Sequence, residues 1–118
     1  MSNEELTELA AKAAGIRLAS HPWTHRGPVG SALTDNGEFW NPRDDDGDAL
    51  RLAAALAGLS PGASFTLSIS KMHDSRGFAS AGFFSRDNPT QQVVDPDLRA
   101  ATRGAIFLAA AEIGKAMP

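Results

Sequence analysis

The stretch that decides the fold is Phe39-Trp40-Asn41-Pro42-Arg43-Asp44-Asp45-Asp46-Gly47-Asp48-Ala49-Leu50-Arg51-Leu52. Its apolar start is typical of a strand end, and Trp40 is expected to pack against the element that follows. The Asn-Pro pair predicts a turn, because proline fixes φ and offers no backbone N–H. Asp44 or Asp45 is then placed to cap a helix, whose first turn favours carboxylates.

Two helices are expected in the first half of the chain. The first runs over residues 3–14, where Ser2 can cap it and Glu5 lies at the capping-box spacing. The second runs over residues 44–57, and its helical periodicity predicts an apolar stripe against the core. The stripe consists of Leu50, Ala53, Ala54 and Ala57, with Leu52 and Leu56 beside it.

A third helix is expected near the C-terminus. Asp95 is expected to cap it, with Pro96 in the first helical position, where the missing N–H of proline costs nothing. Leu98 and Ile106 belong to its apolar face. The segment before this helix, after an Asn88-Pro89 turn, is expected to be a polar connection.

Two β-hairpins are expected between the helices. Residues 29–34 and 38–40 flank Asp35-Asn36-Gly37, and Asn-Gly is the strongest short-range hairpin signal. Residues 65–70 alternate between apolar and hydroxyl side chains, which indicates a strand with one apolar face. Residues 78–84 are expected to return as the partner of that strand.

These elements predict an α+β fold in the order α-ββ-α-ββ-α. We expect one domain over residues 1–118, in which a four-stranded antiparallel sheet packs with three helices. The length is close to that of a common single domain. A hydrophobic content of 42% and a charged content of 21% are typical of a globular chain.

Charge and cysteine content argue against several classes of protein. The net charge is -3 and the arginines are dispersed, so nucleic acid is not an expected partner. The chain contains no cysteine, which excludes disulfides and thiolate zinc sites. The most apolar segment, residues 105–113, is far shorter than the ~20 residues of a membrane span. No basic region precedes an apolar run at the N-terminus, so we expect a cytoplasmic protein without membrane contact.

Metal-ligand types are present without metal-ligand spacing. If Gly47 took the glycine position of an EF-hand loop, Pro42 and Ala53 would fall on ligand positions that neither can fill. His21 and His25 have the spacing of helical zinc ligands, but the proline between them argues against a helix. We therefore expect neither a metal nor a cofactor.

Catalytic patterns are also incomplete. His73-Asp74-Ser75 is explained by turn chemistry, because adjacent residues in a turn rarely point at one atom. Gly27-Pro28-Val29-Gly30 lacks the lysine of a phosphate loop, and its proline removes an amide. We expect no catalytic residue, so the chain is predicted not to be an enzyme.

Aromatic and acidic side chains remain as candidates for a contact surface. Phe83 and Phe84 are neighbours on an expected strand and must point to opposite faces. Trp23 lies in an expected loop, although core burial competes for every ring. For the aspartates, favourable electrostatics at the start of a helix is the competing explanation. The candidate partner surface consists of Trp23, Asp44, Asp45, Asp46 and Phe84.

Several short motifs resemble one family of phage proteins. They are Phe39-Trp40-Asn41-Pro42, then Asp45 with Asp48-Ala49-Leu50-Arg51-Leu52, then Leu98-Arg99-Ala100-Ala101 with Ile106-Phe107-Leu108. Together they resemble the phage ABA-sandwich domain and the NinX-like phage and prophage proteins. The resemblance implies helices on both sides of a sheet, whereas the hydroxyl row of Thr66, Ser68 and Ser70 favours one open face. It implies no functional residues.

Three hypotheses about function follow. The first is a non-enzymatic phage or prophage accessory protein that binds a protein partner, such as a host protein. The second is a small-ligand or nucleotide-binding module, in which polar side chains converge on a pocket: His21, His25, His73, Asp74 and Arg76. The third is a structural homodimer formed through an exposed Phe83 or Phe84.

Overall fold

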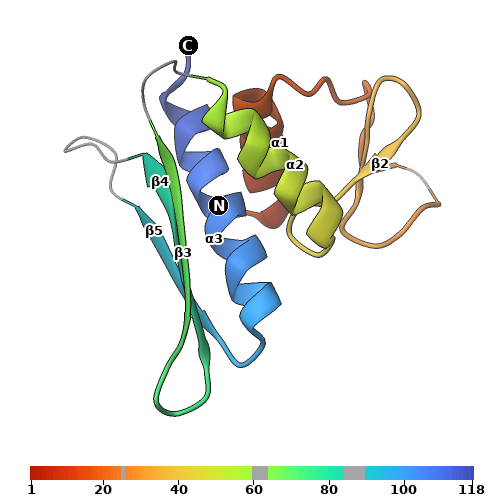
Figure 1. Cartoon of the computed structure of the whole chain (residues 1–118). Helices are drawn as coiled ribbons and strands as arrows, with labels where there is room; N and C mark the ends of the chain where they lie inside the picture. The colour runs from red at the N-terminus through yellow and green to blue at the C-terminus, as the bar shows by residue number, and fades with distance from the viewer. Residues whose placement is uncertain (25, 60–63, 84–89) are drawn as a thin grey trace.

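The structure is a computed structural model that describes residues 1–24, 26–59, 64–83 and 90–118 (Figure 1). Three helices and two small antiparallel sheets make up this part of the chain. The elements are α1 (Asn3–Ala14), β1 (Ala32–Leu33), β2 (Phe39–Trp40), α2 (Asp46–Ala57), β3 (Phe65–Lys71), β4 (Gly77–Phe83), β5 (Gln91–Asp95) and α3 (Leu98–Ala116).

The α+β class is confirmed, but the single four-stranded sheet is wrong. The first hairpin forms a separate sheet of strands β1 and β2, each two residues long. The second sheet has the order β3-β4-β5, because residues 91–95 form a strand where we expected a polar connection. Figure 1 shows the two sheets on opposite sides of the helices. Because β1 and β2 have only two residues each, they do not reach past the helices to join the three-stranded sheet.

Helix α1 forms as the sequence predicts. The Ser2 side chain accepts a hydrogen bond from the Glu5 N–H at 3.1 Å, and Gly15 ends the helix with a φ of 72°. Glycine adopts this left-handed backbone conformation without a steric penalty, because it has no Cβ.

Helix α2 begins two residues later than expected, with Asp45 as the cap. Its expected apolar stripe is wrong in part. The buried residues are Ala49, Leu52 and Leu56, whereas 70% of Leu50 is exposed. Both sets obey helical periodicity, so only the neighbours of the helix decide which set is covered.

Helix α3 also begins later than expected. Asp97 is its cap, not Asp95, and Pro96 lies outside the helix. Asp95 is instead the last residue of β5, where it pairs with Gly77, and its side chain accepts the Asp97 N–H at 2.9 Å. Pairing of β5 with β4 therefore moves the helix start by two residues.

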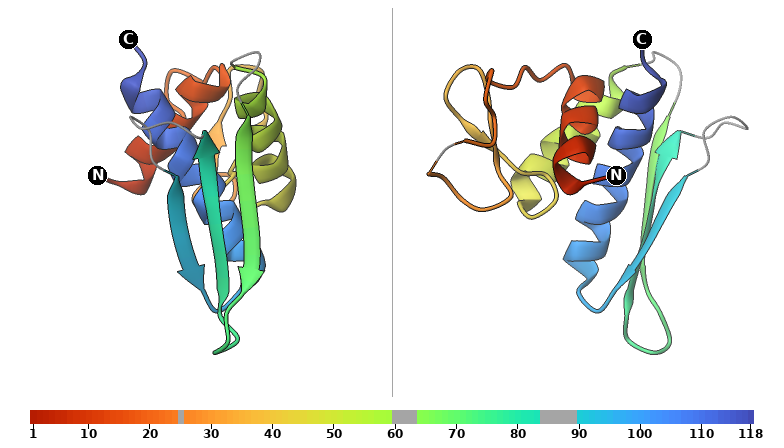
Figure 2. Two further views of the ribbon diagram at one scale, coloured as in Figure 1. Left: turned by 60° about the vertical axis from the view of Figure 1, so that its left-hand side comes forward. Right: turned by 180° about the vertical axis from the view of Figure 1, so that it is seen from behind.

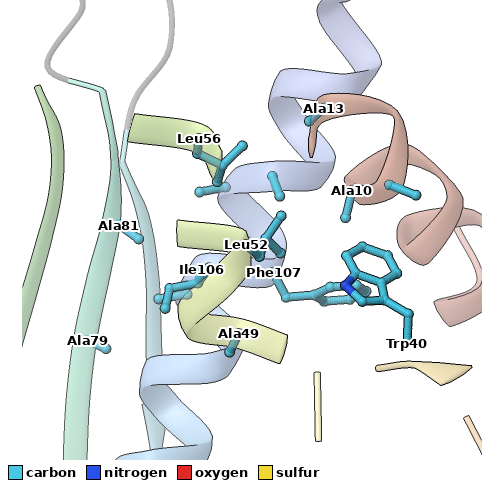
Figure 3. Close-up of a cluster of buried hydrophobic side chains, with 14 of the residues drawn as sticks. Ala10, Ala13, Trp40, Ala49, Leu52, Leu56, Ala79, Ala81, Ile106 and Phe107 are labelled. Carbon is cyan, nitrogen blue, oxygen red and sulfur yellow. The ribbon is translucent and has the colours of Figure 1, made fainter. Parts of the chain in front are cut away.

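The core is built around α3, which lies between the three-stranded sheet on one side and α1 and α2 on the other (Figure 2). Ile106 and Phe107 of α3 are buried, and Figure 3 shows Trp40 beside Phe107 and near Ala10. Trp40 therefore anchors the small sheet to the helices. Many of the remaining core residues are alanines, which let helices and strands approach closely.

One face of the three-stranded sheet is open. Ala79 and Ala81 of β4 are buried beneath α3, and the alternation along the strands places Thr66, Ser68 and Ser70 on the opposite face, where they are exposed. Within the described residues no helix lies on that face (Figure 2). The structure thus agrees with the hydroxyl row, and not with helices on both sides. No described helix is long and apolar enough to cross a membrane.

Candidate protein-docking surface

The acidic cluster is largely occupied by contacts within the chain. The Asp45 side chain accepts the Asp48 N–H at 2.9 Å, which caps α2. Asp44 accepts from the Asn41 side-chain amide at 3.0 Å and lies 3.4 Å from Arg43. These two carboxylates therefore hold the turn and the helix start.

Asp46 connects α2 with α3. Its carboxylate lies 2.5 Å from Arg103 and 3.7 Å from Arg99. The Arg103 side chain is half-buried and also donates to the Arg43 carbonyl at 3.1 Å. Arg99 has the weaker contact and is 78% exposed, so its guanidinium is the more accessible of the two.

The Trp-Asn-Pro turn is held by one further carboxylate. Asp48 accepts the backbone N–H of the buried Asn41 at 2.9 Å and pairs with Arg51 at 2.7 Å. The hydrogen bond and the charge of Asp48 raise the pKa of the Arg51 guanidinium. Asp48 and Arg51 therefore form an ion pair at the i, i+3 spacing of a helix.

The aromatic candidates do not gather at one place. Trp23 is half-buried, and its Nε1 donates to the Glu8 carboxylate at 3.1 Å. Phe83 lies on the helix face of the sheet, where its ring meets Phe65 edge-on at 5.5 Å. Phe84 lies outside the described residues.

The polar residues of the second hypothesis are also dispersed. Asp74 and Arg76 pair at 2.7 Å in the β3–β4 turn, and this hydrogen bond lowers the pKa of Asp74 and raises that of Arg76. His73 lies in the same turn, whereas His21 belongs to the loop between α1 and β1. Figure 1 shows that this loop and the β3–β4 turn are far apart. His25 is outside the described residues. Elsewhere in the described chain no three His, Asp or Glu side chains gather into a metal site.

A groove that sequence reasoning missed lies between α2, β3 and α3. Its volume is about 350 Å³, and its walls are almost entirely carbon. Three large aliphatic side chains line it and remain exposed: Leu50 by 70%, Ile69 by 47% and Leu98 by 37%. Asp46, Arg99 and Arg103 stand among its lining residues and give it a charged rim.

The exposed residues of this groove are the ones that the sequence assigned to the core. Leu50 was expected in the buried stripe of α2, Ile69 on the apolar face of its strand and Leu98 on the core face of α3. Each residue lies on the apolar face that the periodicity predicted. The three lie at the border of the sheet and the helices, where no further element covers them within the described residues. Exposed large apolar side chains that gather in one patch are typical of an interaction site.

The groove is bordered by the outer edge of β3, which pairs with no other strand among the residues that the structure describes. β3 is one of the two outer strands of its sheet, with β5 at the opposite edge, and its register with β4 is continuous from Phe65 to Lys71, without a bulge. The strand contains no proline, and its single charge lies at the end. An edge of this kind offers a row of free N–H and C=O groups to another strand.

A second, more polar cleft lies beside Trp40, between α1, the small sheet and α2. Its volume is about 510 Å³. Its apolar lining residues include Trp40, Phe39 and Leu52. Its charged lining residues are of both signs and nearly balance: Arg17, Arg51, Asp35, Glu38 and Asp48. A smaller cleft of about 260 Å³ lies beside Trp23.

Comparison with known proteins adds no relative: no family model, no curated protein and no solved structure matches this chain. The docking surface is therefore described from its own geometry. We name the groove lined by Leu50, Ile69 and Leu98, together with the outer edge of β3, the β3 docking surface.

Proposed function

We propose that the chain is a non-enzymatic interaction protein that binds an extended polypeptide segment at the β3 docking surface. The observation that carries this proposal is the coincidence of an unpaired strand edge with an apolar groove beside it. A strand that pairs with β3 would place alternate side chains over the groove, beside Leu67 and Ile69. Backbone hydrogen bonds would supply affinity, and the groove would select apolar side chains.

The groove explains why the bound segment is a strand and not a helix. Its lining residues come from β3 as well as from α2 and α3, so an occupant must follow the direction of the sheet. A helix could contact Leu50 and Leu98, but it would leave the backbone groups of the edge unpaired. When a strand binds, the N–H and C=O groups of the edge exchange their hydrogen bonds with water for hydrogen bonds with that strand, so none is left unpaired.

The biological setting proposed here is a phage or prophage accessory role, which rests on the sequence resemblance alone. The acidic residues are assigned a supporting part. Asp46 holds Arg103 at the rim of the groove, and the exposed Arg99, whose contact with Asp46 is the longer one at 3.7 Å, can also bind a carboxylate of the bound segment. Of the four expected surface residues that the structure describes, Asp46 lines the groove, whereas Trp23, Asp44 and Asp45 do not.

Selection of peptides from a displayed random library on the immobilised full-length protein tests this function. We expect enrichment of segments with apolar residues at alternate positions. Ile69→Lys should weaken the binding of a selected peptide at least about tenfold, because it places a charge in the groove. Ser80→Lys on the open sheet face is the matched control and should bind normally. Enrichment without alternation, or equal binding by both variants, would refute the proposal.

Small-ligand binding is the second candidate, and the cleft beside Trp40 favours it by its volume of about 510 Å³. A ligand that binds only the folded state raises the melting temperature. Thermal shift with a panel of nucleotides, and with Arg51→Ala as the comparison, would detect such binding. The absence of a shift for every compound would remove this candidate.

A further inference from the structure

We propose that the segment bound at the β3 docking surface is β3 of a second copy, so that the two sheets join into one across a two-fold axis at Ser68. This inference rests on the proposed function and names the partner of the same surface. This dimer is not the one expected through Phe83, because the ring of Phe83 packs against Phe65 on the helix face of the sheet.

The hydrogen-bonding pattern of the hairpin shows which residues face outward. The Met72 N–H donates to the Arg76 carbonyl at 2.8 Å, so the backbone groups of Met72 point toward β4. Because these groups alternate along a strand, Ser68 also points toward β4. The residues that present N–H and C=O groups at the free edge are Phe65, Leu67, Ile69 and Lys71.

A two-fold axis at Ser68 pairs all of these outward-facing residues. In the antiparallel register it sets Leu67 opposite Ile69 of the second copy, and Phe65 opposite Lys71 of the second copy. Both are hydrogen-bonded pairs, since both members point outward. An axis at Leu67 would pair only Phe65, Leu67 and Ile69 with residues of β3 in the second copy, so it uses fewer of the outward-facing residues of the strand.

The side chains are also self-complementary in this register. On the helix side of the sheet, Leu67 meets Ile69, which covers apolar surface that is exposed in the single chain. On the open side, Thr66 meets Ser70 and Ser68 meets Ser68, so that hydroxyl groups face hydroxyl groups. Cross-strand pairs of these kinds are favourable, and no like charges lie opposite each other.

The middle of this edge, from Thr66 to Ser70, carries no proline, bulge or charge that would prevent such pairing. Natural edge strands are commonly interrupted by proline, by bulges or by inward-facing charges. β3 has seven residues in continuous register, with Lys71 at its end as the single charge. In the proposed dimer this lysine lies opposite Phe65, at the rim, where its charge stays in contact with water.

Cysteine crosslinking tests the register directly, because the chain contains no cysteine. Ser68 faces its own copy in a non-hydrogen-bonded pair, whose Cα separation of about 4.5 Å permits a disulfide. We expect Ser68→Cys to form a covalent dimer under mild oxidation. Thr66→Cys alone should not, because its two copies lie about 13 Å apart along the strands. A mixture of Thr66→Cys and Ser70→Cys should crosslink.

Light scattering of the unmodified protein supplies the second readout. We expect a mass twice the 12.4 kDa of the chain, and Ile69→Lys should weaken dimerisation at least about tenfold by placing a charge opposite Leu67. A monomer at every concentration, or crosslinking of Thr66→Cys as readily as Ser68→Cys, would overturn the inference. A monomer that still binds selected alternating peptides would leave the proposed function intact, whereas one that binds none would remove both.

Discussion

Helix α2 has two apolar sides that differ in what covers them. On one side Leu52 and Leu56 are almost completely buried in the core, where α2 packs against α3. On the other side Leu50 stands 70% exposed beside Ile69 and Leu98. The side chains are chemically alike, so the difference lies in the neighbours. The core of this fold therefore needs only one apolar stripe of α2, and the exposed side around Leu50 can contact a partner.

The largest expected effect separates these two sides. Leu52→Ala should destabilise the protein by about 2–5 kcal/mol, because it leaves a cavity in a closely packed core. Leu50→Ala should change the free energy of unfolding by less than about 0.5 kcal/mol, as at other exposed positions. Urea unfolding followed by circular dichroism measures both. Equal losses would show that Leu50 belongs to the core after all.

A second contrast lies along α3, where two glycines meet different surroundings. A Cβ at Gly114 would overlap the Leu9 carbonyl of α1, whereas a Cβ at Gly104 would make an ordinary contact of 3.4 Å with Val93. Gly114→Ala should therefore cost about 2–3 kcal/mol through overpacking. Gly104→Ala should be neutral or stabilise by up to about 1 kcal/mol through helix propensity. Melting temperatures that move in the same direction would contradict this view of the α1–α3 contact.

The acidic cluster gives a smaller effect that separates capping from surface charge. Asp45→Ala should cost about 1 kcal/mol, because the helix cap is lost. Asp46→Asn removes a charge that is half exposed to solvent and should cost less than about 1 kcal/mol. Raising the salt concentration should reduce only the second effect, since ion pairs are screened. The reverse order of losses would argue for the acidic surface that the sequence suggested.

The smallest effect belongs to the β3–β4 turn, which lies away from both sides of α2. The bond from Arg76 lowers the pKa of Asp74 below its ordinary value of 3.8. A carboxyl with a lowered pKa stabilises the folded state above its unfolded pKa, and this contribution is lost as the pH falls through the folded value. Asp74→Asn should therefore be slightly less stable than wild type at pH 7. The difference should vanish under acid conditions, and a difference that persists there would exclude the carboxylate as its cause.

Local signals in the sequence specified the helices well. Ser2, Glu5 and Gly15 define α1 because caps are satisfied by residues within one turn. The strand β5 was missed because its residues, Gln91 to Asp95, are mostly polar and do not alternate between apolar and polar side chains. Its pairing with β4 is a tertiary choice. The prediction of a single sheet was wrong for the same reason, because no local sequence signal shows that the helices separate β1 and β2 from the other strands.

The candidate site was less predictable than the fold. Periodicity identified Leu50, Ile69 and Leu98 as apolar face residues but could not show that they lie together at the border of the layers. Asp46 was proposed as a contact residue for its charge, and its link to Arg103 required the distance between α2 and α3 to be known. The exposure of the three apolar side chains and the edge position of β3 depend on which surfaces the other elements leave uncovered, and this follows only from the complete fold.

Amide hydrogen exchange along β3 tests the central claim most directly. The amides of Leu67 and Ile69 point away from β4, so in an isolated chain they should exchange with solvent rapidly. If another strand occupies the β3 docking surface, they should become protected as the protein concentration rises or a selected peptide is added. Ile69→Lys should abolish that protection. Rapid exchange of both amides at every concentration and with every peptide would contradict the account.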